Sequence, residues 1–200
     1  MTGYTAHPTA EIGDGATVGD GTHIWQNCII LDGARIGSGC KLAHNVFVEN
    51  GVVVGDRVVI KDNVCLYDGV VIADEAFIGP NAVFTNVRTP RAFIARKNEF
   101  ETTEVGRGAT IGANATLVCG HSIGDYATIG AGAVVTSDVA PYSLMAGNPA
   151  RRIGWVSRAG ERLGPDLCCP STGEKYVETE NALRPATESS VPGASGGTTG

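Results

Sequence analysis

The chain has 200 residues, 28 of them glycine, and a formal net charge of −6. This acidic balance argues against a nucleic-acid-binding protein, because phosphate backbones are bound by basic surfaces. No apolar run is long enough to cross a bilayer and no signal peptide opens the sequence, so we expect a cytoplasmic protein that does not insert into membranes.

A large apolar side chain recurs at every sixth position of the sequence. Neither the 3.6-residue period of a helix nor the two-residue period of a strand produces this spacing. A hexapeptide repeat predicts a parallel β-helix, with three hexads in each triangular coil. The repeat positions are Ile12, Val18, Ile24, Ile30, Ile36, Leu42, Val48, Val54, Ile60, Leu66, Ile72, Ile78 and Phe84, then Val105, Ile111, Leu117, Ile123, Ile129 and Val135.

The residues between these positions fit the same interpretation. The fourth residue after each large one is usually small or β-branched, as at Cys28 and Cys40, which suits a narrow interior. A glycine often follows the large residue, as at Gly37 and Gly112. Either an unusual backbone conformation or close stacking of coils accounts for these glycines. We therefore expect an all-β domain over residues 1–140.

Three segments leave the repeat. Residues 85–104 form a long excursion, and such loops on a regular scaffold are usually functional. Residues 141–183 are expected to cap the open end of the solenoid, and Pro149 predicts a short C-terminal helix there. Residues 184–200 are rich in Ser, Thr, Gly and Pro, which predicts a disordered tail.

Arginines gather in two of these segments, in contrast to the acidic average of the chain. Arg88, Arg91 and Arg96 lie in the first segment, and Arg151 and Arg152 lie in the second. Local positive patches indicate small anionic ligands such as phosphates or carboxylates. The alternative interpretation is that they are solvated surface charges.

Two motifs, together with the hexads, resemble one family. They are F-T-N-V-R-T-P-R (84–91) and A-G-N-P-A-R-R-I-G-W (146–155). The chain resembles the left-handed β-helix nucleotide-sugar N-acetyltransferases from about His7 to Tyr176. The resemblance implies the left-handed sense and a homotrimer whose active sites lie between neighbouring β-helices.

The resemblance also implies the substrates. Acetyl-CoA would be the acetyl donor, with no metal, and the amino sugar would attack the thioester directly. The acceptor would be of the UDP-2-acetamido-3-amino-2,3-dideoxy-glucuronate type, in O-antigen or surface polysaccharide synthesis. A dTDP-3-amino-3,6-dideoxyhexose is the alternative acceptor.

Asn86 is the expected catalytic residue. It matches the family asparagine that holds the attacking amino group, and its amide oxygen can accept a hydrogen bond from that amine. A turn-capping role is the alternative, since asparagine favours turns.

Other site residues follow from the resemblance with less specific motifs. Arg91 and Arg96 are expected to bind a carboxylate or diphosphate. His44 stands where the family carries glutamine, so its role does not follow from the resemblance: from its own chemistry it is expected to contact the substrate or accept a proton, or else to be a plain surface histidine. The remaining substrate contacts are Asn63, Tyr67 and Thr85. The expected acetyl-CoA contacts are Arg151, Arg152, Gly112, Ala113, Gly130 and Ala131.

Two other functions are alternatives for a chain with this scaffold. A zinc-dependent anhydrase needs several converging histidines, but His7, His23 and His44 are not separated by multiples of six. A purely structural solenoid would show repeated threonine rows and no long excursion. The excursion and the arginine clusters favour an enzyme over both.

Overall fold

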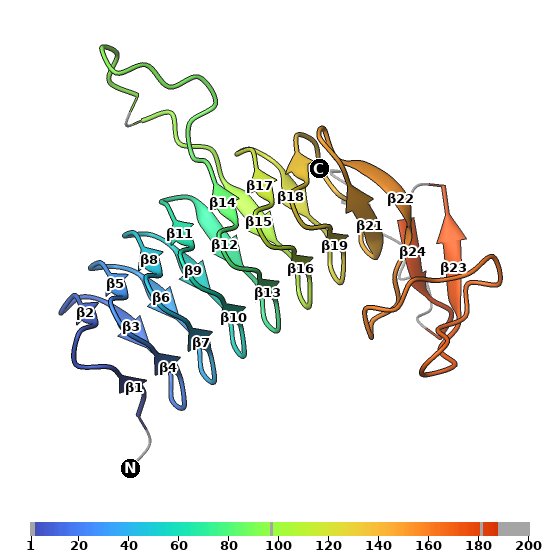
Figure 1. Ribbon diagram of the computed structural model, residues 1–200, viewed down its shortest axis with the longest axis horizontal. Helices are drawn as coiled ribbons and strands as arrows, with labels where there is room; N and C mark the ends of the chain where they lie inside the picture. The colour runs from blue at the N-terminus through green and yellow to red at the C-terminus, as the bar shows by residue number, and fades with distance from the viewer. Residues whose placement is uncertain (1–2, 97, 181, 188–200) are drawn as a thin grey trace, which may run out of the picture.

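The computed structural model describes residues 3–96, 98–180 and 182–187. Over these residues the protein is an all-β solenoid without a helix, whose coils stack along the long axis (Figure 1). The β-solenoid is consistent with the left-handed β-helix that the family resemblance implies. Among the described residues, no helical segment has the length and apolar character needed to cross a bilayer.

Three sheets form the sides of the prism, because from β1 to β20 the strands pair in parallel with the strand three places away, and β21 and β22 then extend the first sheet. Sheet A contains β1 (Thr5–Ala6), β4 (His23–Ile24), β7 (Lys41–Leu42), β10 (Val59–Ile60), β13 (Phe77–Ile78), β16 (Thr110–Ile111), β19 (Thr128–Ile129), β21 (Ser143–Ala146) and β22 (Arg151–Trp155). Sheet B contains β2 (Glu11–Ile12), β5 (Ile29–Ile30), β8 (Phe47–Val48), β11 (Cys65–Leu66), β14 (Val83–Phe84), β17 (Thr116–Leu117) and β20 (Val134–Val135). Sheet C contains β3 (Thr17–Val18), β6 (Arg35–Ile36), β9 (Val53–Val54), β12 (Val70–Ile72), β15 (Thr103–Val105) and β18 (Ser122–Ile123).

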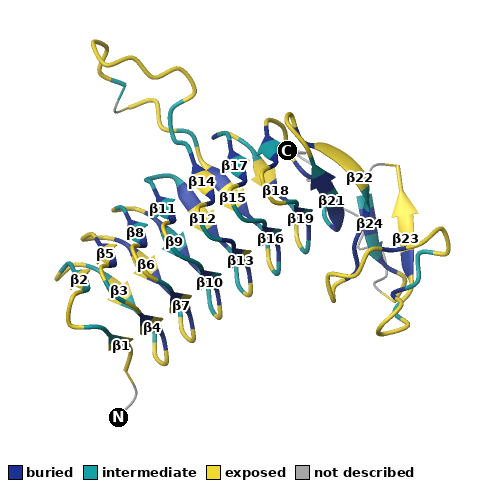
Figure 2. Cartoon of the chain, in the orientation of Figure 1, coloured by how far each residue is buried: buried dark blue, intermediate teal, exposed yellow. Residues whose placement is uncertain are grey.

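The predicted repeat positions form the core. The second residue of most strands is buried, while the first is exposed or half-buried (Figure 2). Ile30, Leu42 and Ile129 are at most 1% exposed, and the small positions Cys28 and Cys40 are fully buried. Burying an apolar side chain of this size contributes roughly 1.5–3 kcal/mol, so the stack of identical layers carries much of the stability.

The glycines that follow the large residues are explained by coil stacking. A Cβ placed on Gly112 would lie 2.5 Å from the backbone nitrogen of Ala131 in the next coil, and one on Gly37 would lie 2.5 Å from the carbonyl oxygen of Gly55. The left-handed backbone conformations occur two residues further along each corner, as at Gly39 and Asn45. Close stacking, of the two alternatives, is therefore the reason for these glycines.

Two rows of corners border sheet B, one on each side. The AB edge is the row of corners that lead from sheet A to sheet B, at residues 25–28, 43–46, 61–64, 79–82, 112–115 and 130–133. The BC edge is the row that leads from sheet B to sheet C, and it includes residues 67–69, the excursion at 85–102 and residues 118–121. The excursion projects from the solenoid as a mostly exposed loop (Figures 1 and 2).

The predicted C-terminal helix is wrong. Residues 143–146 form β21, which continues sheet A beside β19, and residues 151–155 form β22, which pairs antiparallel with β21. Pro149 lies in the turn between them, and Gly147 supplies the positive φ of 94° that this turn uses. Pairing with the exposed end of sheet A, together with the β-forming Ile153 and Trp155, decides the conformation here.

The rest of the cap is a small second core. It is formed by Tyr142, Trp155, Leu163, Cys169, Tyr176 and Leu183. The hairpin β23 (Tyr176–Thr179) and β24 (Ala182–Pro185) completes it. Arg184 and Pro185 therefore belong to a strand and not to the predicted tail, while residues 188–200 of that tail lie outside the described residues.

Candidate functional site

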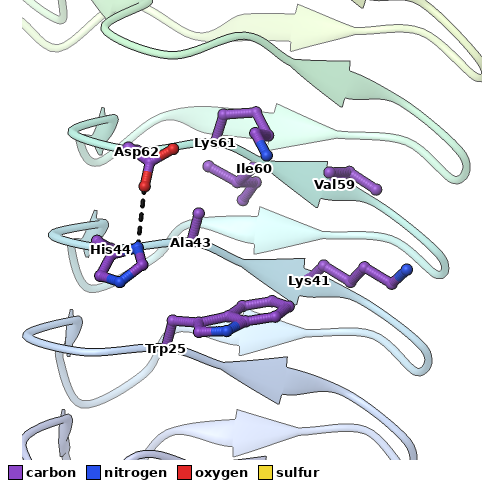
Figure 3. Close-up of a pocket in the computed structure, with 8 residues that line it drawn as sticks. All are labelled: Trp25, Lys41, Ala43, His44, Val59, Ile60, Lys61 and Asp62. Atoms are coloured by element: carbon purple, nitrogen blue, oxygen red, sulfur yellow. Dashed lines mark hydrogen bonds and ion pairs between the residues drawn. The ribbon is translucent and has the colours of Figure 1, made fainter.

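The AB edge carries a histidine–aspartate pair. His44 and Asp62 lie 18 residues apart, on successive coils, and His44 Nδ1 is 3.0 Å from Asp62 Oδ1 (Figure 3). A hydrogen bond from its own backbone N–H lowers the pKa of the Asp62 carboxyl, and the contact with His44 lowers it further against the effect of desolvation. An ionised carboxylate only accepts hydrogen bonds, so Nδ1 is the donor to Asp62, and in the neutral form of the ring the lone pair then lies on Nε2.

The pair borders a hollow of about 270 Å³. Its walls come from three successive coils of the AB edge and of the adjoining outer face of sheet A (Figure 3). The lining residues are Trp25, Lys41, Ala43, His44, Val59, Ile60, Lys61 and Asp62. Because about half of the His44 side chain is exposed, its ring is accessible to a molecule in this hollow. The pair therefore has the geometry of an oriented proton acceptor.

Asn86 lies on the other edge of sheet B, at the base of the BC-edge loop. Its carbonyl oxygen accepts a hydrogen bond from Glu101 N at 2.9 Å, which closes the loop base. Thr85 Oγ1 accepts from Cys119 N, also at 2.9 Å. The half-buried Asn86 side chain has no hydrogen-bond partner among the described residues, which leaves its amide oxygen and nitrogen unpaired.

An ion pair reinforces the loop base. Arg88 Nη2 lies 2.7 Å from Glu101 Oε2, and Arg88 also donates to the carbonyl of Cys119 at 3.3 Å. The hydrogen bond from Arg88 lowers the pKa of the Glu101 carboxyl. The sequence placed Arg88 in a general anion-binding cluster, whereas in the structure its charge holds the loop to the solenoid.

The predicted substrate residues divide between the two edges. Asn63 and Tyr67 line a hollow of about 140 Å³ on sheet B, which also includes Val83 and Phe84, directly before Thr85. Burial raises the pKa of the Tyr67 hydroxyl. The Asn63 amide already belongs to a ladder, since it accepts from Asn45 at 3.0 Å and donates to Asn81 at 3.1 Å.

The two predicted loop arginines have different surroundings. Arg96 lies 2.6 Å from Glu99 in an ion pair, and its Nε is buried without a partner among the described residues. Arg91 is exposed and donates to the carbonyl of Pro90 at 2.8 Å. Arg91 therefore has the freer guanidinium for an anionic ligand.

The predicted acetyl-CoA residues lie along the AB edge and just beyond it. Gly112, Ala113, Gly130 and Ala131 occupy its last two corners. Arg151 and Arg152 lie on β22, next to β21, and the Arg152 guanidinium carbon lies 4.0 Å above the Trp155 ring. Because residues 151–155 are a strand and not the helix predicted at Pro149, no helix N-terminus offers backbone N–H groups to an anion here. His44 and all four predicted corner residues thus share one edge, away from Asn86.

The cysteines fall into two groups. Cys28 and Cys40 are fully buried in the solenoid, where burial raises the pKa of both thiols. Cys169 lies in the second core with its Sγ 3.2 Å from Ser157 Oγ, and hydrogen bonds with Ser157, Ser171 and Thr172 lower the pKa of this thiol to about 6. Within the described residues, no group of three or more His, Cys, Asp or Glu side chains is arranged to hold a metal ion.

Family models of the hexapeptide repeat match most of the solenoid. The bacterial transferase hexapeptide model matches residues 15–50 and 51–86, and the succinyl-transferase hexapeptide repeat matches residues 103–137. Together these segments are more than half of the chain. The chain therefore belongs to the hexapeptide-repeat proteins.

Individual relatives match shorter parts of the chain. The chain is 50% identical over 64 residues to a dTDP-3-amino-3,6-dideoxy-α-D-galactopyranose 3-N-acetyltransferase from Aneurinibacillus thermoaerophilus, which is 32% of this chain and 33% of that protein. It is 45% identical over 51 residues to a chloramphenicol acetyltransferase from Agrobacterium fabrum, which is 26% of this chain and 24% of that protein. The matched segments therefore span a third or less of each relative.

A solved structure supports the fold. A perosamine N-acetyltransferase variant from Caulobacter crescentus, in complex with CoA and GDP-perosamine, matches with a TM-score of 0.52 and 20% identity. The match covers 76% of this chain and 56% of that one. At this identity the comparison bears on the solenoid fold alone.

Proposed function

We propose that this chain transfers the acetyl group of acetyl-CoA to an amino group of a nucleotide-linked sugar. The His44–Asp62 pair carries the proposal, because it sets an oriented proton acceptor on the edge that also carries the predicted acetyl-CoA residues. The 50% identity to an amino-sugar acetyltransferase supports the acceptor class.

The chemistry needs alignment and one proton transfer. The amine nitrogen forms a bond to the thioester carbon, the C–S bond breaks, and the electron pair leaves with the sulfur. His44 Nε2 takes the proton that the amine loses and returns it to the CoA thiolate. A thiol with a pKa near 8.5 leaves readily, so holding the two substrates in line supplies much of the rate enhancement.

Asn86 completes the site from a second copy of the chain. It lies on the BC edge, and the width of sheet B separates it from His44 on the AB edge. A site that uses both residues therefore takes its AB edge from one protomer and its loop base from the neighbour. A homotrimer with clefts between neighbouring β-helices provides this arrangement.

The acceptor has two candidates. A UDP-2-acetamido-3-amino-2,3-dideoxy-glucuronate-type sugar is favoured by Arg91, whose exposed guanidinium suits the sugar carboxylate. A dTDP-3-amino-3,6-dideoxyhexose is favoured by the identity to the Aneurinibacillus enzyme. We place the reaction in the cytoplasm, in keeping with the six free cysteines.

One assay tests the proposal. Free-thiol release from acetyl-CoA is followed with each of the two amino-sugar nucleotides, with the 3-hydroxy analogues as controls. We expect release with an amine and none with the hydroxyl. Activity on the dTDP-deoxysugar alone would discard the uronate, and the absence of release with amino-sugar nucleotides of either type would overturn the proposed function.

A further inference from the structure

The hollow beside His44 has three side chains that the acetyl transfer described above does not use. Trp25, Lys41 and Lys61 line it together with His44 (Figure 3). They come from three successive coils, so the solenoid repeat itself brings them together.

Stacking in register explains the shape of the hollow. Trp25, Ala43 and Lys61 occupy the same corner position in consecutive coils, and each is fixed by a backbone hydrogen bond to the next coil. Trp25 N donates to Leu42, Ala43 N to Ile60 and Lys61 N to Ile78, at 2.8 to 2.9 Å. The small methyl group of Ala43 leaves open the space between the indole and the lysine stem.

The two lysines differ from most arginines of the solenoid and its loop. Arg57, Arg88, Arg96 and Arg107 each lie within 3.0 Å of a carboxylate. Among the described residues, neither Lys41 nor Lys61 has a carboxylate within ion-pair distance, and the nearby Asp62 is engaged by His44. Two uncompensated cations in one hollow of an acidic chain favour an anionic ligand.

Trp25 adds an aromatic surface to these charges. Its side chain is 39% exposed although tryptophan is usually well buried, and the His23 ring lies 6.3 Å away. Exposed aromatic rings beside basic groups are typical of sites where a nucleobase stacks and its phosphates pair with cations.

We propose that Trp25, Lys41 and Lys61 form a docking site for a nucleoside diphosphate group, with the base against the indole and the phosphates on the lysines. This inference rests on the proposed function, which it deepens: the nucleotide is that of the acceptor sugar. The CoA nucleotide has the same chemistry, but its predicted phosphate contacts, Arg151 and Arg152, lie at the far end of the AB edge. Docking here directs the attached amino sugar toward His44 Nε2.

Direct binding of UDP, dTDP and CoA tests the inference without requiring turnover. Titration calorimetry is combined with tryptophan fluorescence, in which Trp155 contributes little to the change because it is only 8% exposed. We expect UDP or dTDP to quench Trp25. Removal of the paired cations in a Lys41→Met/Lys61→Met variant should weaken that affinity about 10- to 100-fold, and Trp25→Ala about 10-fold.

The matched control is Lys175→Met, which removes an exposed lysine from the C-terminal extension and should change nothing. Thermal unfolding of each variant shows that it remains folded. The inference is overturned if the double variant and Trp25→Ala bind UDP and dTDP as the wild type does, or if only CoA affinity falls. Nucleotide binding at these residues without acetyl transfer would instead reject the proposed function and keep the docking site.

Discussion

The two edges of sheet B differ in a way that corresponds to the two halves of the proposed site. The AB edge keeps its period throughout, and its regular corners place His44, Asp62 and the predicted acetyl-CoA residues in one line. The BC edge loses its period at Thr85 and extends a loop whose base holds Asn86. A regular edge aligns groups along the solenoid axis, whereas an interrupted edge reaches outward, in our proposal toward a neighbouring copy of the chain.

Of the substitutions on the AB edge, replacement of His44 should lower the activity most. We expect His44→Gln to lower kcat about 10²- to 10⁴-fold, because a general base is lost. Asp62→Asn should lower kcat less, since the ring remains but loses its orienting carboxylate. A His44→Gln enzyme that loses only its affinity for the acceptor, measured as KM, would reduce His44 to a substrate contact.

Replacement of Asn86 tests whether the BC edge contributes to catalysis. Asn86→Ala should reduce kcat/KM about 10- to 100-fold, because the attacking amine loses its alignment. The oligomeric state, measured by light scattering, should not change. Asn98→Ala, on the same loop, is the control and should retain full activity. Loss of assembly in Asn86→Ala would instead assign this residue a structural role.

A substitution just beyond the last corner of the AB edge should weaken the binding of acetyl-CoA and not that of the amino sugar. We expect Arg151→Met to raise the KM for acetyl-CoA about tenfold, since one charged contact with a phosphate is removed, and to leave the KM for the amino sugar unchanged. Arg35→Met, on the outward face of sheet C, is the control. An equal rise in both KM values would contradict a donor-specific role.

The smallest expected effect concerns the fold of the AB edge. Gly112→Ala places a methyl group 2.5 Å from Ala131 N and should destabilise the protein by about 1–3 kcal/mol, measured by denaturant unfolding. Gly15→Ala is the matched control, because its nearest atom would be 3.4 Å away. Equal stability of the two variants would show that coil stacking does not require Gly112.

The repeat made most of the fold predictable, since a six-residue period admits few alternatives. Within the cap, the predicted helix is wrong because Pro149 is typical of a helix start in the local sequence, whereas pairing of β21 with β19 is a tertiary effect that local sequence does not reveal. The second core around Cys169 was missed for the same reason.

The candidate site was predictable in part. The loop base could be located because the period fails at Thr85. Asp62, Trp25 and Lys61 were missed, although their positions relative to His44 and Ala43 follow from a signal in the sequence. When the chain is written in rows of 18, His44 stands above Asp62, and Trp25 and Lys61 flank Ala43. Which ion pairs form, such as that of Arg88 with Glu101, depends on side-chain packing that the repeat does not specify.

The central claim is that His44 and Asn86 act in one site from two copies of the chain. Co-expression of differently tagged His44→Gln and Asn86→Ala chains, followed by isolation of mixed oligomers, tests it most directly. Each mixed trimer brings an intact His44 edge to an intact Asn86 loop base at one of its three interfaces, so the mixed oligomers should regain measurable acetyl transfer although each parent is impaired. If the mixture is no more active than the two parents, both residues act within a single chain and the claim is contradicted.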